Sequence, residues 1–164
     1  MPRRFPNYPD CPVCGDHEVN PVTLGVRWSW DDESQRVIGC FTPDRRHTGY
    51  AGRLHGGVLS ALMDECLAWA CAKERASFCI TGELTMRFKL PALLGEEIAL
   101  SGWVVTARGP YVRAAGETRG PDGRLIATAV GTFRALPREE SEALAQSLRL
   151  APGDVDILAL TVDS

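Results

Sequence analysis

The sequence has little of what would direct a protein to nucleic acid or to a membrane. Its 18 Lys and Arg residues are outnumbered by 21 Asp and Glu residues, and the formal net charge is −3. A nucleic-acid backbone would call for a clustered basic excess, so this class of partner is not expected. The N-terminus has no apolar segment typical of a signal peptide, and the most apolar stretch, residues 58–72, is interrupted by two carboxylates. We therefore expect a cytoplasmic protein without a membrane partner.

The sequence also lacks a second Cys-x-x-Cys pair, which bears on its six cysteines. A core of this size buries roughly 70% of the unfolded surface, so disulfides and structural metals are not required, and cytoplasmic thiols stay reduced. Cys11 and Cys14 with His17 offer three potential zinc ligands, whereas a closed site needs four. Cys40 could supply the fourth only by coincidence of the fold. We expect free thiols, no metal and no cofactor.

The hydrophobic pattern divides the chain into an arm, a domain and a tail. Residues 1–21 hold five prolines and no periodic pattern, which predicts an irregular arm without a strand. Strands are predicted at 22–30, 35–42, 79–90, 97–108, 111–119 and 124–136. Residues 58–75 are apolar on nearly every side, which predicts an enclosed helix. An antiparallel sheet can bury such a helix only by curling around it, so we predict an α+β domain over 22–136 and a charged, partly helical tail over 137–164.

The strand at 79–90 has the clearest alternation. Its apolar residues fall at even positions and Thr81 at an odd one. We therefore expect Thr81 to point away from the apolar face, towards whatever covers the other side of the sheet.

Two adjacent carboxylates, Asp64 and Glu65, are the only charged residues between Val58 and Ala72. A buried carboxylate needs hydrogen bonds, a charged partner or a proton. In one interpretation, one carboxylate turns to solvent at a gap in the sheet and the other caps a buried network. In the other, Asp64 is a nucleophile or general base.

Gly56 and Gly57 precede this helix, where free backbone N–H groups suit a developing oxyanion. On one straight helix, eight residues separate the backbones of Gly56 and Asp64 by about 12 Å, too far to serve one carbonyl group. Two antiparallel copies of the helix could bring Gly56 of one chain near Asp64 of the other. A catalytic interpretation therefore implies a dimer.

The segment 55–65, HGGVLSALMDE, resembles the helix motif of hotdog-fold acyl-CoA thioesterases of the phenylacetate-pathway type. The resemblance continues through residues 81–88, Pro91 and Gly95-Glu96, and upstream through residues 11–15 and Asn20-Pro21, so that it covers roughly residues 11–136. It implies the hotdog fold, an antiparallel sheet curled around one long central helix.

The resemblance also implies roles for individual residues. Asp64 matches the nucleophile or general base, the Gly56 N–H the oxyanion donor, and Thr81 a hydroxyl that helps to place the attacking water. His55 matches a structural or substrate-orienting residue, with Gly57 beside it at the substrate. Gly49 departs from the pattern, because several relatives carry an assisting Asn or Gln there. His47 is near enough in sequence to substitute.

The resemblance implies hydrolysis of an acyl-CoA, or a related acyl thioester, to free acid and thiol at the interface of a homodimer or a homotetramer. A non-catalytic acyl-CoA-binding module is the alternative that Gly49 suggests. An enoyl-thioester hydratase is a further alternative, although the short Asp and His motif of those enzymes is not found in this sequence.

Overall fold

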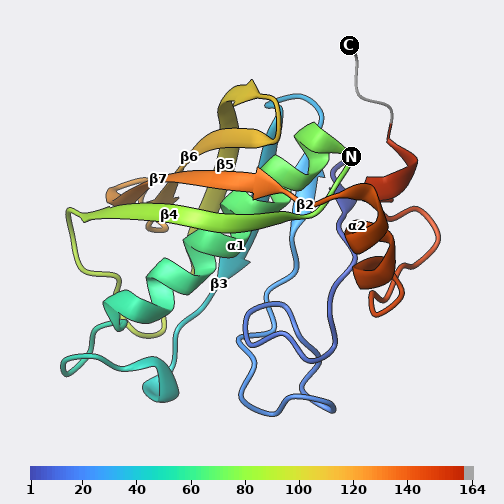
Figure 1. Cartoon of the computed structure of the whole chain (residues 1–164). Coiled ribbons are helices and arrows are strands. Elements are labelled where there is room, and N and C mark those ends of the chain that lie inside the picture. Colours follow the sequence, from blue (N-terminus) through green and yellow to red (C-terminus); the bar gives the residue numbers. More distant parts are fainter. Residues whose placement is uncertain (161–164) are drawn as a thin grey trace.

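A seven-stranded antiparallel sheet curls around the long helix α1 (Figure 1). The computed structural model describes residues 1–160. The strands are β1 (Arg3–Arg4), β2 (Ser29–Asp31), β3 (Arg36–Phe41), β4 (Cys79–Phe88), β5 (Ile98–Arg108), β6 (Tyr111–Arg119) and β7 (Leu125–Ala135). The helices are α1 (Gly56–Arg75) and α2 (Arg138–Ala145), with short 3-10 turns at Arg45–His47 and Ile157–Ala159. The predicted α+β fold, in which an antiparallel sheet encloses one long helix, is confirmed.

The strand order places β4 at one edge of the sheet. The order is β1-β2-β3-β5-β6-β7-β4, and within the described residues β4 pairs with β7 alone. Ile80 and Phe88 on this strand are 49% and 55% exposed. The outer edge of β4 is therefore a ten-residue strand edge with apolar side chains exposed beside it.

Helix α1 lies close against the middle of the sheet because the strands carry glycines there. Gly102 of β5 and Gly116 of β6 are direct neighbours in the sheet. A Cβ at Gly116 would lie 2.5 Å from Cε of Met63, and a Cβ at Gly102 would lie 3.0 Å from Sγ of Cys66. Both helix side chains are fully buried. The two glycines thus let the helix approach the backbone of β5 and β6.

The predicted strand over 22–30 is wrong for most of its length, since only its last two residues lie in β2. Val26 and Trp28 are buried as the alternation indicated. The backbone of this segment, however, bonds to the arm: the N–H of Leu24 donates to the carbonyl of Pro12, and that of Val26 to Val13. Alternating burial reports which side chains face the core, and it does not identify the backbone partner.

The arm also differs from its prediction, because it contains a short strand. β1 pairs with β2, and the N–H of Phe5 donates to the carbonyl of Trp28. The Phe5 ring stacks on Trp69 of α1 with the ring centroids 5.0 Å apart. The arm is therefore attached to both the sheet and the central helix.

Strand β4 contains a bulge that reverses the expected orientation of Thr81. Thr81 pairs with Phe133 and Glu83 with Thr132, so Gly82 is an extra residue on β4. The bulge interrupts the two-residue alternation, and Thr81 lies on the same face as buried Phe133. The prediction that Thr81 points away from the helix is wrong, because residues before and after the bulge follow opposite phases.

The predicted helix in the tail is confirmed as α2. The Oγ of Ser141 lies 2.6 Å from the Oγ of Ser77, and it accepts the backbone N–H of Phe78 at 3.1 Å. All three residues are buried. These bonds hold α2 at the junction between α1 and β4. Residues 161–164 of the predicted tail lie outside the described residues.

Candidate active site

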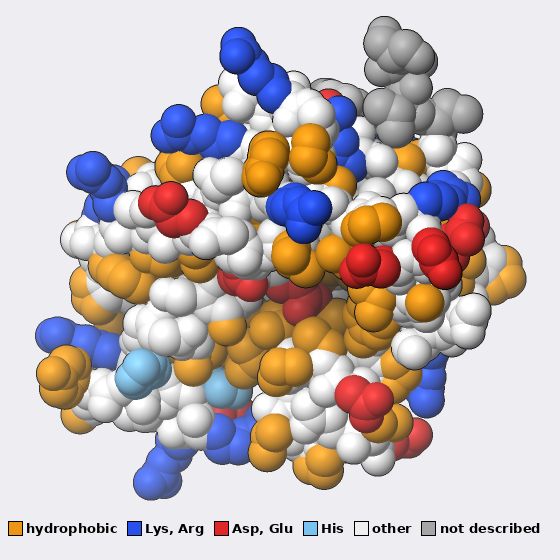
Figure 2. All heavy atoms as spheres, viewed as in Figure 1, with side chains coloured by type: hydrophobic (Ala, Val, Ile, Leu, Met, Phe, Trp, Pro, Cys, Tyr) orange, Lys and Arg blue, Asp and Glu red, His pale blue; other side chains and the backbone are white. Residues whose placement is uncertain are grey.

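Asp64 and Thr81 meet between helix α1 and the edge strand β4. The Thr81 hydroxyl donates to Oδ1 of Asp64 at 2.9 Å, and Asp64 is half-buried. Figure 2 shows a hollow across this face, below β4, with carboxylates at its bottom and hydrophobic side chains around them. Within residues 1–160, the second carboxylate oxygen of Asp64 has no hydrogen-bond partner. This pair has the composition of a carboxylate base or nucleophile with an orienting hydroxyl.

Glu65 has a different environment from its neighbour. Its Oε1 accepts the indole N–H groups of Trp28 at 3.0 Å and Trp69 at 3.3 Å, and its Oε2 accepts the Cys11 thiol at 3.0 Å. Glu65 therefore caps a buried network, as one sequence interpretation proposed for one of the two carboxylates, whereas Asp64 is half-buried and bonds to the exposed Thr81.

The N-terminus of α1 is capped by His55. Its Nδ1 accepts the Gly57 N–H at 2.9 Å, which satisfies one of the free amides of the first turn. Gly56 is the first helical residue, so its N–H has no acceptor within the helix. A Cβ at Gly56 would lie 3.4 Å from the ring of Phe88. His55 and Gly57 are thus bonded to each other, and within residues 1–160 the Gly56 amide has no acceptor.

A cavity of about 620 Å³ lies at this end of the helix. Its wall includes His55, Gly56 and Phe88, together with the cationic side chains Arg53 and Lys89. The helix N-terminus and the two cations give this cavity a positive character, which suits a phosphate-bearing ligand.

The structure gives a steric reason for Gly49. A Cβ there would lie 2.9 Å from Cα of His55, so any side chain would require the loop to shift. His47 does not replace the missing side chain: its Nδ1 accepts the N–H of Asp44 at 2.9 Å, and its ring packs on Phe41. Burial lowers the pKa of His47. His47 therefore stabilises its own loop and lies outside the cavity at the helix N-terminus.

The two halves of the expected site lie far apart within one chain. Gly56 and Asp64 are eight residues apart on one unbroken helix, so about 12 Å separates their backbones. The structure brings Asp64 to Thr81, and His55 to Gly57, but it does not bring these two pairs together.

Sequence reasoning did not identify the contacts of Glu65. The position of Glu65 in an apolar stretch predicted that it needs partners, but Cys11 is 54 residues away and Trp28 is 37 residues away. No local pattern could have named them.

Comparison with known proteins shows which family and which folds the chain is similar to. The Thioesterase superfamily model matches residues 51–127. No curated protein matches the sequence significantly. The crystal structure of a thioesterase superfamily protein aligns with a TM-score of 0.65 and 28% identity, over 75% of this chain and 62% of that one. The chain thus spans less than two thirds of that protein.

Two more distant structures share the fold. The PaaI protein of the phenylacetic acid degradation operon of E. coli aligns with a TM-score of 0.63 and 19% identity, over 70% of this chain and 81% of that one. A Streptococcus mutans protein solved bound to acetyl-CoA aligns with a TM-score of 0.58 and 17% identity, over 62% of this chain and 81% of that one.

These findings define the class of protein. The chain has the hotdog fold, and its residues 51–127 match the Thioesterase superfamily model, which confirms the resemblance drawn from its sequence. Its fold is shared with the E. coli PaaI protein. No helix in the described part of the chain is long and apolar enough to cross a membrane.

Proposed function

We propose that the protein hydrolyses an acyl-CoA, or a related acyl thioester, at a site formed by two copies of the chain. The observation that carries the proposal is the hydrogen bond from Thr81 to Asp64 below the free edge of β4. Asp64 attacks the thioester carbonyl or activates water, and Thr81 orients the carboxylate and the water. The Gly56 N–H of the second copy holds the oxyanion.

The cavity at the helix N-terminus supports coenzyme A as the thiol carrier. Arg53 and Lys89 in its wall suit phosphates, and Phe88 offers an apolar surface. Two structural neighbours were solved with acetyl-CoA or with coenzyme A. Because these neighbours are 17% identical to this chain, their ligands support the proposal only through the shared fold.

The free edge of β4 supports a shared site. A long unpaired edge is a template for pairing with another chain, and antiparallel pairing of β4 with its copy would set the two α1 helices antiparallel. Gly56 of one chain would then approach Asp64 of the other. Such a homodimer needs no metal for the hydrolytic step, since the carboxylate and the amide supply the base and the oxyanion donor.

The test is thiol release from a panel of acyl-CoA substrates by wild type, Asp64→Asn and Glu83→Gln. Asn keeps the shape of Asp but is neither basic nor nucleophilic, so we expect kcat to fall at least about 100-fold. Glu83 is an exposed carboxylate beyond the bulge, and its variant should match wild type.

Other outcomes identify the alternatives. A change in enoyl absorbance without thiol release would indicate a hydratase, and binding without either change would indicate a non-catalytic acyl-CoA-binding module. Unchanged turnover in Asp64→Asn would contradict the assignment of the carboxylate.

A further inference from the structure

The Cys11-x-x-Cys14 loop, which the proposed hydrolysis does not use, lies against Glu65 of α1. One ligating atom from each of Cys11, Cys14 and Glu65 lies within 4.8 Å of the other two. We propose that these three side chains bind one Zn²⁺ ion, with a fourth position left to water or to a ligand in the adjoining cavity.

The loop already has the geometry of a metal-binding turn. The backbone N–H groups of Val13 and Cys14 both donate to Sγ of Cys11, at 3.3 Å and 3.4 Å. Such bonds stabilise a thiolate, which is the form that binds metal. Without a metal, the Cys11 thiol donates to Oε2 of Glu65. Once both cysteines are deprotonated, two thiolates and a carboxylate would repel one another, and a bound cation would offset that repulsion. Thiolate sulfur is the ligand that distinguishes zinc from calcium or magnesium.

Glu65 is held in an orientation suited to ligation. The indoles of Trp28 and Trp69 both donate to Oε1, while Oε2 points at Cys11. Zinc would take the place of the thiol protons: the protons of Cys11 and Cys14 leave to solvent, and Oε2 exchanges the Cys11 donor for the metal. The indole bonds can persist and orient the carboxylate from outside the ligand set.

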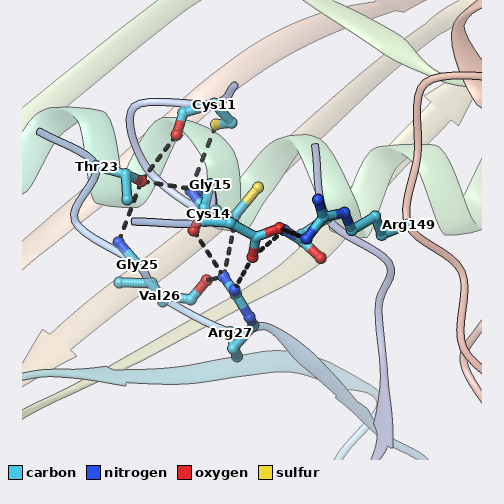
Figure 3. A network of polar contacts seen from close by, with 10 residues as sticks. Cys11, Cys14, Gly15, Thr23, Gly25, Val26, Arg27 and Arg149 are labelled. Atoms are coloured by element: carbon cyan, nitrogen blue, oxygen red, sulfur yellow. Dashed lines mark hydrogen bonds and ion pairs between the residues drawn. The ribbon is translucent and has the colours of Figure 1, made fainter. Parts of the chain in front are cut away.

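Residues 23–27, which follow the arm, hold the Cys11–Cys14 loop by hydrogen bonds to its backbone (Figure 3). The Arg27 guanidinium donates to the carbonyls of Cys14 at 2.5 Å and of Gly15 at 3.2 Å. The Thr23 hydroxyl donates to the carbonyl of Cys11 at 2.8 Å and accepts the N–H of Gly15 at 3.0 Å. Because these bonds involve the backbone, they hold both cysteines in place without engaging either sulfur.

A cavity of about 280 Å³ gives access to the site, since Cys11, Cys14 and Glu65 all line it. The ligands considered from the sequence lie elsewhere: His17 and Cys40 line a different cavity, of about 810 Å³. Three protein ligands and one open position is the arrangement of a zinc site that accepts water or substrate. Glu65 thus supplies the ligand that the arm lacks.

The experiment titrates the full-length, reduced, chelator-treated protein with Zn²⁺ and, separately, with Co²⁺. We expect one ion per chain and a thiolate-to-cobalt charge-transfer absorption. Cys14→Ser should abolish this absorption, and Glu65→Gln should weaken zinc binding at least about 10-fold. Gln retains an oxygen for the two indoles but replaces the ligating oxygen with an amide nitrogen. Cys40→Ser is the matched control and should bind as wild type does.

A measurement on the wild type keeps the proposal testable if a variant misfolds. Zinc should protect Cys11 from alkylation, as read by mass spectrometry, and should leave the exposed Cys40 reactive. Substoichiometric uptake, equal uptake by folded Cys14→Ser, or alkylation of Cys11 unaffected by zinc would each overturn the proposal.

Discussion

Asp64 and Glu65 show how two adjacent carboxylates on one helix acquire different roles. Glu65 accepts three hydrogen bonds from side chains that enclose it, whereas Asp64 accepts one, from Thr81. A carboxylate with both oxygens hydrogen-bonded stabilises a network, and one with a free oxygen can act on a substrate. The difference arises from what surrounds each side chain, since successive helix residues point about 100° apart.

At this scale the first prediction concerns the Thr81 hydroxyl. Thr81→Val keeps the β-branched shape but removes the hydrogen bond to Asp64. We therefore expect kcat to fall because the activation free energy rises by about 1 to 3 kcal/mol. Thr81 is exposed, so the melting temperature should change little. Thr81→Ser keeps the hydroxyl and should retain most activity.

Two results would contradict this role. Wild-type kcat in Thr81→Val would make Thr81 a strand residue only, and loss of activity in proportion to stability would make its hydroxyl structural.

At the scale of the element, the start of α1 combines a structural cap with a candidate oxyanion site. His55 accepts the Gly57 N–H through Nδ1, leaving the Gly56 amide free. A side chain that caps the second amide and not the first keeps the helix end stable while one donor stays available. The backbone of His55 is extended, with φ −66° and ψ 132°.

We expect His55→Ala to destabilise the fold by about 1 kcal/mol through loss of this cap, which lowers the melting temperature by about 2 to 4 °C. His55→Asn should restore stability because Asn is a favoured capping residue. Thermal unfolding measures both. If kcat/KM stays low in the stable His55→Asn variant, the imidazole also contacts substrate; unchanged stability of His55→Ala would refute the capping role.

At the scale of the whole molecule, β4 leaves the described chain with an unpaired strand edge beside the Asp64–Thr81 pair. Exposed apolar residues at Ile80 and Phe88 accompany that edge. An edge of this kind needs a cover. A second copy would supply both the cover and the Gly56 amide that one helix cannot bring to its own Asp64.

The shared site can be tested by mixing two inactive variants. Gly56→Pro removes the amide N–H, and Pro is compatible with the first helical position and with the extended His55 before it. Gly56→Ala keeps the N–H and adds a methyl group at 3.4 Å from Phe88, an ordinary contact. We expect Gly56→Pro to lower kcat about 100- to 1,000-fold, whereas Gly56→Ala should have only a small effect on kcat.

Co-expression of Asp64→Asn with Gly56→Pro should then recover about a quarter of wild-type activity, since half the dimers are mixed and one of their two sites is intact. No recovery in verified mixed dimers, or an active monomer of 17.9 kDa by sedimentation, would refute the shared site.

The amino-acid sequence by itself determined the central helix, the run of four strands after it and the family motif. These depend on periodicity and on residues close together in the chain, such as His55, Gly56 and Asp64. Only the tertiary structure decided which way Thr81 points, because the bulge at Gly82 depends on the register of β4 against β7. It also decided the partners of Glu65 and the backbone bonds of residues 22–28, because these join segments far apart in the sequence, and no local pattern specifies a distant partner.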